Sequence, residues 1–260
     1  MNNSLDFSGQ AVLVTGGSRG IGRGIAEAFL AAGAEVAICG RKEPHDLPSA
    51  GDATATFFKA DVRDAEQVER LIDTVVATLG RLDVLVNNAG GAPFADAATV
   101  SPRFSEKVIQ LNLISALHCA QQANRVMQQQ PSGGSIINIA SVSGIRPSPG
   151  TAAYGAAKAG LINLTGTLAI EWAPKVRVNV ISAGLIQTEQ SHLHFGDAEG
   201  MARVAQTVPL QRLGTGSDVA GACMFFASPL AAYVSGANLI LHGGGETPAF
   251  LSAASVNRGE

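Results

Sequence analysis

Short apolar runs alternate with longer amphipathic stretches along almost the whole chain. The apolar runs end at glycine or polar residues and predict buried strands at 11–15, 35–40, 55–60, 82–87, 134–141, 176–182 and 237–243. Between them, apolar residues recur at helical spacing and predict helices at 20–32, 64–79, 101–130 and 152–173. Strands that alternate with helices are typical of a parallel sheet covered on both faces. The pattern therefore predicts an α/β fold with a doubly wound, seven-stranded parallel sheet, in a single domain over residues 1–260.

Two stretches interrupt this alternation. Residues 42–53 hold two prolines, so any helix that crosses over there must be short. Residues 247–260 have no hydrophobic period and predict a polar C-terminal tail.

Composition and charge narrow the kinds of partner. Hydrophobic residues make up 46% of the chain and charged residues 15%, which suits a well-buried globular protein. A net charge of −3 gives no reason to expect nucleic acid or an anionic membrane as partner. With no long apolar run and no N-terminal signal pattern, we expect a cytoplasmic protein. We expect the three cysteines to be reduced, and no metal at His192 and His194, which lack a third ligand.

A glycine-rich octapeptide, TGGSRGIG, joins the first predicted strand to the first helix. Gly16, Gly20 and Gly22 allow a sharp turn and a close approach to a pyrophosphate at the helix N-terminus. The octapeptide also fits a tight turn with no ligand, but its place between strand and helix favours dinucleotide binding.

The residues around this turn favour one cofactor over another. The second predicted strand ends in ICGRK and offers no acid for a ribose 2′-hydroxyl. Arg19 lies within the turn and Arg41 at the end of the second strand, and two guanidiniums suit a 2′-phosphate. The sequence predicts NADP as cofactor, with NAD less favoured.

The stretch TAAYGAAKAG places Tyr154 and Lys158 one turn apart on a predicted helix, among small residues. On one helix face, an ammonium near a phenol favours the phenolate and lowers a pKa that starts near ~10. Ser141 ends the fifth strand, so its hydroxyl is expected at the same sheet edge. Asn112 is a poor helix former in the middle of a predicted helix and needs a reason to be there.

Taken in order, these motifs resemble the short-chain dehydrogenase/reductase family, in its single-domain branch, and are similar to 3-oxoacyl-[acyl-carrier-protein] reductases. The resemblance covers residues 8 to 245 and rests on TGGSRGIG, Asp61-Val62, NNAG at 87–90, Asn112, Ser141, YGAAK at 154–158 and Asn179. It implies a Rossmann-type fold and an oxidoreductase that interconverts a secondary alcohol and a ketone.

The resemblance also implies roles for single residues. Tyr154 would be the acid/base, and Lys158 would lower its pKa and hold the nicotinamide ribose. Ser141 would orient the substrate oxygen, and Asn112 would complete a tetrad that holds a water against the lysine. The expected cofactor contacts are Gly16, Ser18, Arg19, Gly20, Ile21, Gly22, Arg41, Asp61, Val62, Asn88, Ala89, Gly90, Tyr154, Lys158, Ile186 and Thr188.

Two positions depart from the family pattern. The pair after the sixth strand is Ala183-Gly184 where the family usually has Pro-Gly, which predicts looser positioning of the cofactor carboxamide. His242 stands near the C-terminus where the family often has aspartate, and we expect it to affect an interface or strand cap.

The substrate, a small carbonyl or alcohol compound, is expected among residues 90–94, 142–150 and a loop at about 186–210. Arg146 would meet an anionic substrate group or stay solvated. The helices at 101–130 and 152–173 are expected to expose Ala116, Ala120, Ala157 and Gly166, and similar helices pair in homodimers or homotetramers of the family.

Several functions remain open from the sequence. The substrate class includes 3-oxoacyl thioesters and steroid-like hydroxyl compounds, with an NAD-dependent dehydrogenase as one alternative. A nucleotide-binding regulator without turnover would be expected to lose the tyrosine or lysine, and both are present. A sugar epimerase or dehydratase of the longer relatives would need an extra C-terminal substrate domain.

Overall fold

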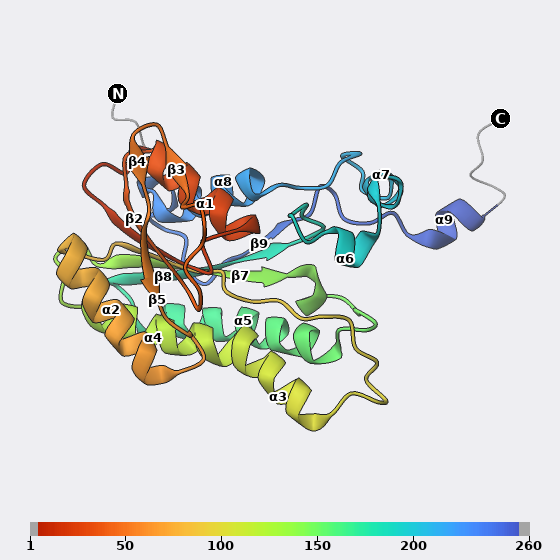
Figure 1. Cartoon of the computed structure of the whole chain (residues 1–260), viewed down its shortest axis with the longest axis horizontal. Coiled ribbons are helices and arrows are strands. Elements are labelled where there is room, and N and C mark those ends of the chain that lie inside the picture. Colours follow the sequence, from red (N-terminus) through yellow and green to blue (C-terminus); the bar gives the residue numbers. More distant parts are fainter. Residues whose placement is uncertain (1–4, 255–260) are drawn as a thin grey trace.

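A parallel sheet with helices on both faces forms the body of the molecule (Figure 1). The computed structural model describes residues 5–254, and within them the main sheet has seven strands in the order β5-β2-β1-β6-β7-β8-β9. These strands are β1 (Ala11–Thr15), β2 (Glu35–Gly40), β5 (Thr56–Lys59), β6 (Val84–Asn87), β7 (Gly134–Ser141), β8 (Val176–Ala183) and β9 (Asn238–Leu241). All neighbouring pairs are parallel, so the predicted doubly wound sheet is confirmed.

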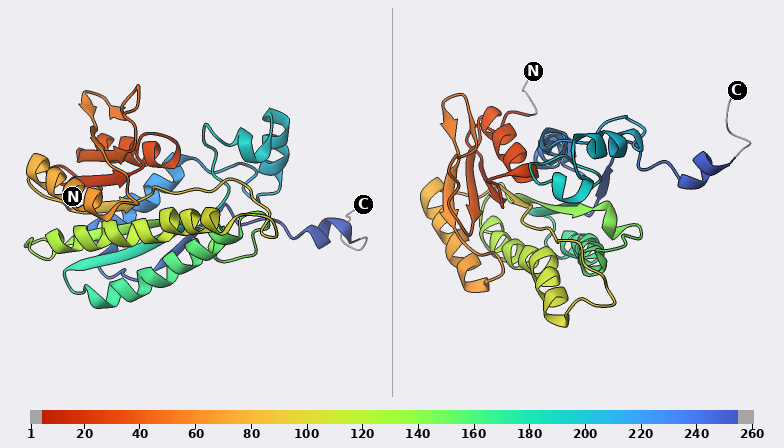
Figure 2. Two further views of the ribbon diagram at one scale, coloured as in Figure 1. Left: turned by 60° about the horizontal axis from the view of Figure 1, so that its bottom comes forward. Right: turned by 45° about the vertical axis from the view of Figure 1, so that its right-hand side comes forward.

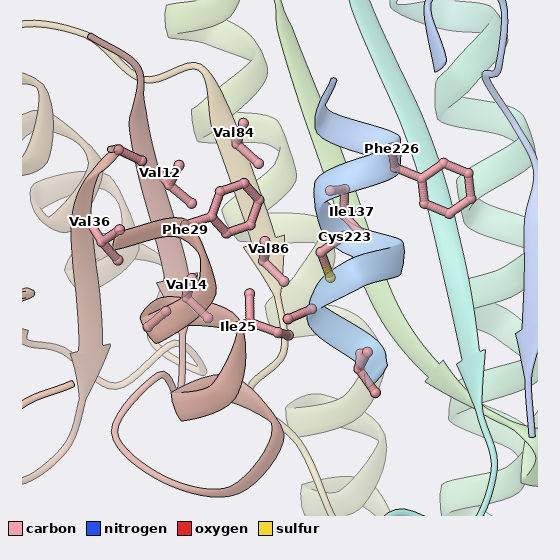
Figure 3. Close-up of a cluster of buried hydrophobic side chains, with 14 of the residues drawn as sticks. Val12, Val14, Ile25, Phe29, Val36, Val84, Val86, Ile137, Cys223 and Phe226 are labelled. Atoms are coloured by element: carbon pink, nitrogen blue, oxygen red, sulfur yellow. The ribbon is translucent and has the colours of Figure 1, made fainter. Parts of the chain in front are cut away.

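One face of the sheet is covered by α1 (Gly20–Ala31) and α8 (Gly216–Ala227), as Figures 1 and 2 show. Ile25 and Phe29 of α1 lie beside Cys223 of α8 over the strands (Figure 3), and all three side chains are fully buried. The two helices approach very closely, since a Cβ on Gly24 would lie 2.8 Å from the carbonyl carbon of Gly216. This contact fixes the N-terminus of α1 against the start of α8.

The other face carries α2 (Ala65–Leu79), α4 (Ser115–Met127) and α5 (Ala152–Glu171). Asp64 caps α2 by accepting hydrogen bonds from two backbone amides, and Gly80 ends the helix with a left-handed φ. A second core cluster forms beneath these helices. The three cysteines are buried and free, as expected.

The helix predicted at 101–130 is interrupted. It consists of α3 (Pro102–Ile109), a π-helical segment (Gln110–Ile114) and α4, with Ser101 as N-cap. A π-helical turn contains one extra residue relative to an α-turn and often marks a functional site. The segment surrounds Asn112, the residue that the sequence marked as out of place in a helix.

Three further segments complete the described chain. Residues 42–53 form no helix, and a small hairpin of β3 (Ser49–Ala50) and β4 (Ala53–Thr54) lies at their end. Between β8 and α8, the chain forms α6 (His192–Phe195) and α7 (Ala198–Gln206). Among the described residues, no helix combines the length and apolar character needed to cross a membrane.

The C-terminal segment leaves the body after β9. Gly243, Gly244 and Gly245 have φ values of 65°, 99° and 89°, and the chain then reaches α9 (Ala249–Ala253), which projects away from the sheet (Figures 1 and 2). A polar tail without periodicity was expected here, but Phe250 is 68% exposed on this short helix. The part of that prediction at 255–260 lies outside the described residues.

The small residues expected on helix surfaces correct one prediction. Ala116, Ala120 and Ala157 are all buried within the subunit, at 8%, 1% and 1% exposure. They let α4 and α5 approach the sheet, so they cannot form a contact between subunits. Gly166 of α5 does have open space above it.

Candidate active site

The carboxyl ends of β1, β6, β7 and β8 lie next to one another at one edge of the sheet. The strand order reverses between β1 and β6, and open parallel sheets bind ligands at such a point. The glycine turn follows β1, the NNAG motif spans the end of β6, Ser141 ends β7 and Gly184 follows β8. The fold therefore gathers the predicted motifs at one edge.

Tyr154 and Lys158 lie on successive turns of α5. Lys158 Nζ is 5.6 Å from the centroid of the Tyr154 ring. The lysine is buried, and its Nζ donates a hydrogen bond of 2.7 Å to the backbone carbonyl of Ile139 on β7. The structure thus brings the two side chains together and fixes the lysine to the sheet.

Burial controls the acidity of both groups, because removal from water disfavours the charged form. It raises the pKa of Tyr154, and a hydrogen bond from Ser141 offsets part of that rise. Burial also lowers the pKa of Lys158 from 10.5 to about 8. The sequence predicted a lowered pKa for the phenol, and this was wrong for the protein without cofactor because desolvation outweighs the favourable contacts. At neutral pH the phenol holds its proton.

Ser141 stands where β7 passes into a 3-10 turn, Val142–Gly144. Its Oγ accepts a hydrogen bond of 3.1 Å from the backbone amide of Ser143, which orients the side chain. The same hydroxyl hydrogen-bonds to Tyr154. Two hydroxyl groups from different elements therefore face one point, where a substrate oxygen can bond to both.

Asn112 links the π-helical segment to the chain that follows β6. Its Oδ1 accepts from the amide of Gly91 at 2.8 Å, and its Nδ2 donates to the carbonyl of Gly91 at 3.0 Å. A Cβ built on Gly90 would lie 2.7 Å from Asn112 Oδ1 and 3.3 Å from Lys158 Nζ. Asn112, Gly90 and Lys158 therefore meet beside the tyrosine, and the two bonds to Gly91 explain an asparagine within a helix.

The glycine turn is held by side chains of the neighbouring strands. Asn88 Nδ2 donates to the carbonyls of Thr15 and Gly16 at 2.9 and 3.2 Å. Thr15 Oγ1 accepts from the amides of Asn88 and Ala89, both at 3.0 Å. A Cβ on Gly22 would lie 2.5 Å from the carbonyl oxygen of Gly16, so only glycine fits there. The N-cap residue of α1, Arg19, forms no side-chain hydrogen bond with the first turn of the helix.

Most arginines in the described chain pair with carboxylates: Arg23, Arg63, Arg70, Arg81, Arg125, Arg146, Arg203 and Arg212. Within residues 5–254, the guanidiniums of Arg19 and Arg41 form no hydrogen bond or ion pair. Arg41 lies near enough to Asp61 to lower the pKa of that carboxyl slightly, although the hydrogen bonds from Arg63 lower it most. Two free guanidiniums thus flank the glycine turn and the end of β2.

The chain after β8 returns to the glycine turn. Ile186 pairs with Gly214 in an isolated bridge, and the methyl group of Thr188 would lie 3.3 Å from a Cβ on Gly20. The carboxylate of Glu189 accepts a hydrogen bond of 3.1 Å from the amide of Gly20. A carboxylate therefore stands at the N-terminus of α1, where a helix favours negative charge.

The remaining predicted cofactor residues also lie around this edge. Ser18 is half-buried in the turn, Ile21 packs partly on the core under α1, and Val62 is buried in the core under α2. Sequence reasoning missed Thr15 and Glu189. Thr15 begins the quoted octapeptide and so carried a signal, whereas nothing in the sequence connects Glu189 with Gly20. In the described residues no group of three histidine, cysteine or acidic side chains forms a metal site.

Comparison with known proteins gives consistent matches. A family model described as Enoyl-(Acyl carrier protein) reductase matches residues 16–246. The L-rhamnose 1-dehydrogenase (NAD(P)(+)) of Azotobacter vinelandii is 36% identical over 245 residues, 90% of this chain and 96% of that protein. The 3-oxoacyl-[acyl-carrier-protein] reductase of Synechocystis is 36% identical over 248 residues, 92% and 97% of the two chains. The ligand-free aldohexose dehydrogenase of Thermoplasma acidophilum has a TM-score of 0.85 and 30% identity, covering 98% of both chains.

Proposed function

The chain belongs to the short-chain dehydrogenase/reductase family and is an oxidoreductase, and from that premise we propose that it interconverts a ketone and a secondary alcohol with NADP(H). Relatives with this level of identity carry names that specify NAD(P), a sugar or an acyl carrier substrate. Because those substrates differ, the choice of substrate rests on the residues of this chain. The observation that carries the proposal is the meeting of Ser141, Tyr154 and Lys158 at the carboxyl edge of the sheet.

The residues at this edge fit a dinucleotide. The N-terminus of α1, where no side chain of the turn caps the helix, and the glycines of the turn suit a pyrophosphate. The free guanidiniums of Arg19 and Arg41 suit a 2′-phosphate, which supports NADP over NAD. We assign the nicotinamide side to Thr188, Ile186 and the Tyr154–Lys158 pair. When bound, the nicotinamide supplies or accepts the hydride.

The side chains of this protein carry the proton transfer. In the direction of reduction, the substrate oxygen accepts hydrogen bonds from Ser141 and Tyr154, and as it gains charge the Tyr154 hydroxyl gives it a proton. The raised pKa of Tyr154 keeps the phenol protonated for this step at neutral pH. The Lys158 ammonium then stabilises the phenolate that remains. Alcohol oxidation reverses these steps, so it requires the phenolate and is favoured at higher pH.

Replacement of one oxygen atom tests the proposal. Tyr154→Phe removes the hydroxyl while it keeps the ring, and general acid–base catalysis is worth about 10²–10⁴ in rate. We expect kcat for NADPH-dependent ketone reduction to fall at least 100-fold, measured by loss of absorbance. Tyr233→Phe is the matched control, because Tyr233 is fully exposed in the segment between α8 and β9 and lines no part of the site. Undiminished turnover in Tyr154→Phe would contradict the assignment.

We also propose a homodimer or homotetramer. Leu239 and Ile240 are exposed on the edge strand β9, and Ile170 is 82% exposed at the end of α5. An unpaired strand edge with apolar side chains is a ready surface for a second chain. Light scattering coupled to size-exclusion chromatography measures the mass directly, and a monomer would contradict the proposal.

A further inference from the structure

The pocket beside Tyr154 has a chemistry that selects among substrates. We propose that the substrate is a ketone or secondary alcohol with hydrocarbon substituents, and that a polyhydroxylated compound such as a sugar is a poor substrate. The inference rests on the proposed function, since it names the class of compound that the same site takes.

A cavity of about 80 Å³ has Tyr154 in its lining and lies between the chain after β6, α3 and the start of α5. Its walls are mostly apolar, from Ala92, Pro93, Ala95, Val100, Phe104 and Val108. Across the described chain, no acid, amide or cationic side chain lines it. A hydroxyl group placed there would lose its hydrogen bonds to water without a replacement, which disfavours its entry.

The few hydroxyl groups nearby are mostly engaged with one another. Ser143 and Ser148 share a hydrogen bond of 3.0 Å. Thr151, which lines the cavity, bonds through Oγ1 to the carbonyl and hydroxyl of Ser148 at 3.0 and 2.8 Å. Apart from Tyr154 itself, Ser105 is then the only lining hydroxyl in the described residues without a hydrogen-bond partner. Sugar recognition needs several such groups, and this wall does not supply them.

The arginine in the loop after β7 is paired with a carboxylate. Arg146 forms an ion pair with Glu246, which lies just beyond the three glycines after β9. This contact differs from both sequence expectations for Arg146, an anionic substrate group or solvent. The paired arginine leaves the mouth of the site without a free cation at that position.

Apolar surface continues outward from the cavity. The Phe94 side chain is 75% exposed, and its ring lies against Gly150, where any Cβ would overlap it. The amide of Ala95 bonds to the carbonyl of Gly150 at 2.8 Å, so the two loops are joined at this point. Ile145 is exposed on the neighbouring loop. Phe94 is therefore placed to cover the part of a substrate that extends past the cavity.

The size of the cavity adds a second restriction. Cavities of about 150 Å³ with apolar walls hold a benzene ring. The cavity beside Tyr154 is about half as large, so it accommodates a short alkyl group on one side of the carbonyl carbon. The longer substituent then lies toward Phe94. The specificity residues are Phe104 for the short side and Phe94 for the long side.

Matched substrates test the chemistry. We would measure kcat/KM with NADPH for 2-heptanone, 2-decalone, 2-pentanone and 1-hydroxy-2-pentanone, and with NADP⁺ for L-rhamnose. The expected result is a value for 2-pentanone at least tenfold above that for its hydroxylated analogue, with the highest value for a hydrocarbon ketone. A higher value for L-rhamnose or the hydroxyketone would overturn the inference while the proposed function stands. No turnover of any compound would instead contradict the proposed function.

Two variants test the residues. Phe104→Ala enlarges the cavity and should raise the ratio of kcat/KM for 3-heptanone to that for 2-heptanone at least fivefold. Phe94→Ala should raise KM for 2-heptanone and leave that for acetone unchanged. The control is Phe225→Ala, a partly exposed phenylalanine of α8 on the opposite face of the sheet. Ratios between substrates do not depend on the fraction of enzyme that folds, so unchanged ratios in both variants would overturn the assignment.

Discussion

The glycine turn, which we call the nucleotide side of the site, and the cavity beside Tyr154, which we call the substrate side, differ in the contacts that form them. Around Thr15, Gly16 and Gly22, backbone groups and short side chains are joined by many hydrogen bonds, and the space for other atoms is minimal. Around Phe94 and the cavity beside Tyr154, the walls are apolar side chains from a loop and from the starts of α3 and α5, and Phe94 is largely exposed. The first arrangement tolerates little variation, whereas the second changes its selectivity with single side chains. Chemistry common to a family and selectivity particular to one member can thus occupy one sheet edge.

The largest expected effect is on cofactor binding, after a substitution in the closely packed glycine turn. Gly22→Ala places a methyl group 2.5 Å from the Gly16 carbonyl oxygen, so the turn must shift. We expect the Kd for NADPH to rise at least 100-fold, measured by nucleotide fluorescence. The control is Gly221→Ala in α8, where nothing lies within 4 Å of the new methyl group. That change should leave binding intact and stabilise the helix by roughly 0.5–1 kcal/mol. Equal binding in both variants would contradict the comparison.

Lys158 lies where the two sides meet, and its burial has a cost. The pKa of Lys158 is about 8 in the folded protein, below its ordinary value of 10.5. The charged ammonium therefore destabilises the folded protein below pH 8. This destabilisation decreases as the pH rises from 8 to 10.5. The full penalty at pH 7 is on the order of 3 kcal/mol. Lys158→Met should abolish activity yet raise the free energy of unfolding at pH 7 by about 1–3 kcal/mol, with a smaller gain at pH 10.

Denaturant unfolding at the two pH values measures the gain. Lys107→Met, at an exposed position of α3, serves as the control and should change stability little at either pH. A gain in Lys158→Met that did not vary with pH would show that the charge is not its cause.

A substitution of Arg41 tests the selectivity of the site for NADP over NAD. Arg41→Gln removes a guanidinium that has no ion pair in the described chain, and a phosphate contact of this kind is strong and directional. We expect the Kd for NADPH to rise about tenfold and the Kd for NADH to change less than twofold. Arg70→Gln on the exposed face of α2 is the control. An equal change for both cofactors would remove the basis for NADP selectivity.

The smallest expected effect concerns Glu189. Its carboxylate bonds to the Gly20 amide and places negative charge where an anionic cofactor would bind. Glu189→Gln should therefore lower the Kd for NADPH about two- to fivefold at low salt, with a smaller change at high salt. Glu199→Gln, on α7 and paired with Arg203, is the matched control. Weaker binding in Glu189→Gln would mean that the carboxylate supports the cofactor site.

Sequence reasoning succeeded where local pattern decides structure. The apolar runs and the glycine turn predicted the sheet and the edge at which Ser141 and Tyr154 meet, because strand ends of a parallel sheet coincide. The motifs gave candidate residues at fixed spacing. Their chemical roles remain proposals.

Sequence reasoning failed for features that depend on contacts between segments distant in the chain. The π-helical segment holds Asn112, whose side chain forms two hydrogen bonds with Gly91, 21 residues away in the chain. The raised pKa of Tyr154 depends on how deeply α5 packs, which periodicity does not report. Ala120 of α4 and Ala157 of α5 are buried within the subunit, which small size alone does not predict. The cavity beside Tyr154 depends in the same way on how α3 lies against α5.

The glycines after β9 show how the chirality of residues determines the path of the backbone. Gly243, Gly244 and Gly245 follow a path that L-residues rarely take, at about 1–2 kcal/mol for each residue forced to follow it. A D-residue prefers the mirror-image torsions, so D-alanine introduced by chemical ligation at these positions would keep the path to α9. L-alanine would redirect it. The direction of the C-terminal arm is therefore encoded in chirality as well as in contacts between side chains.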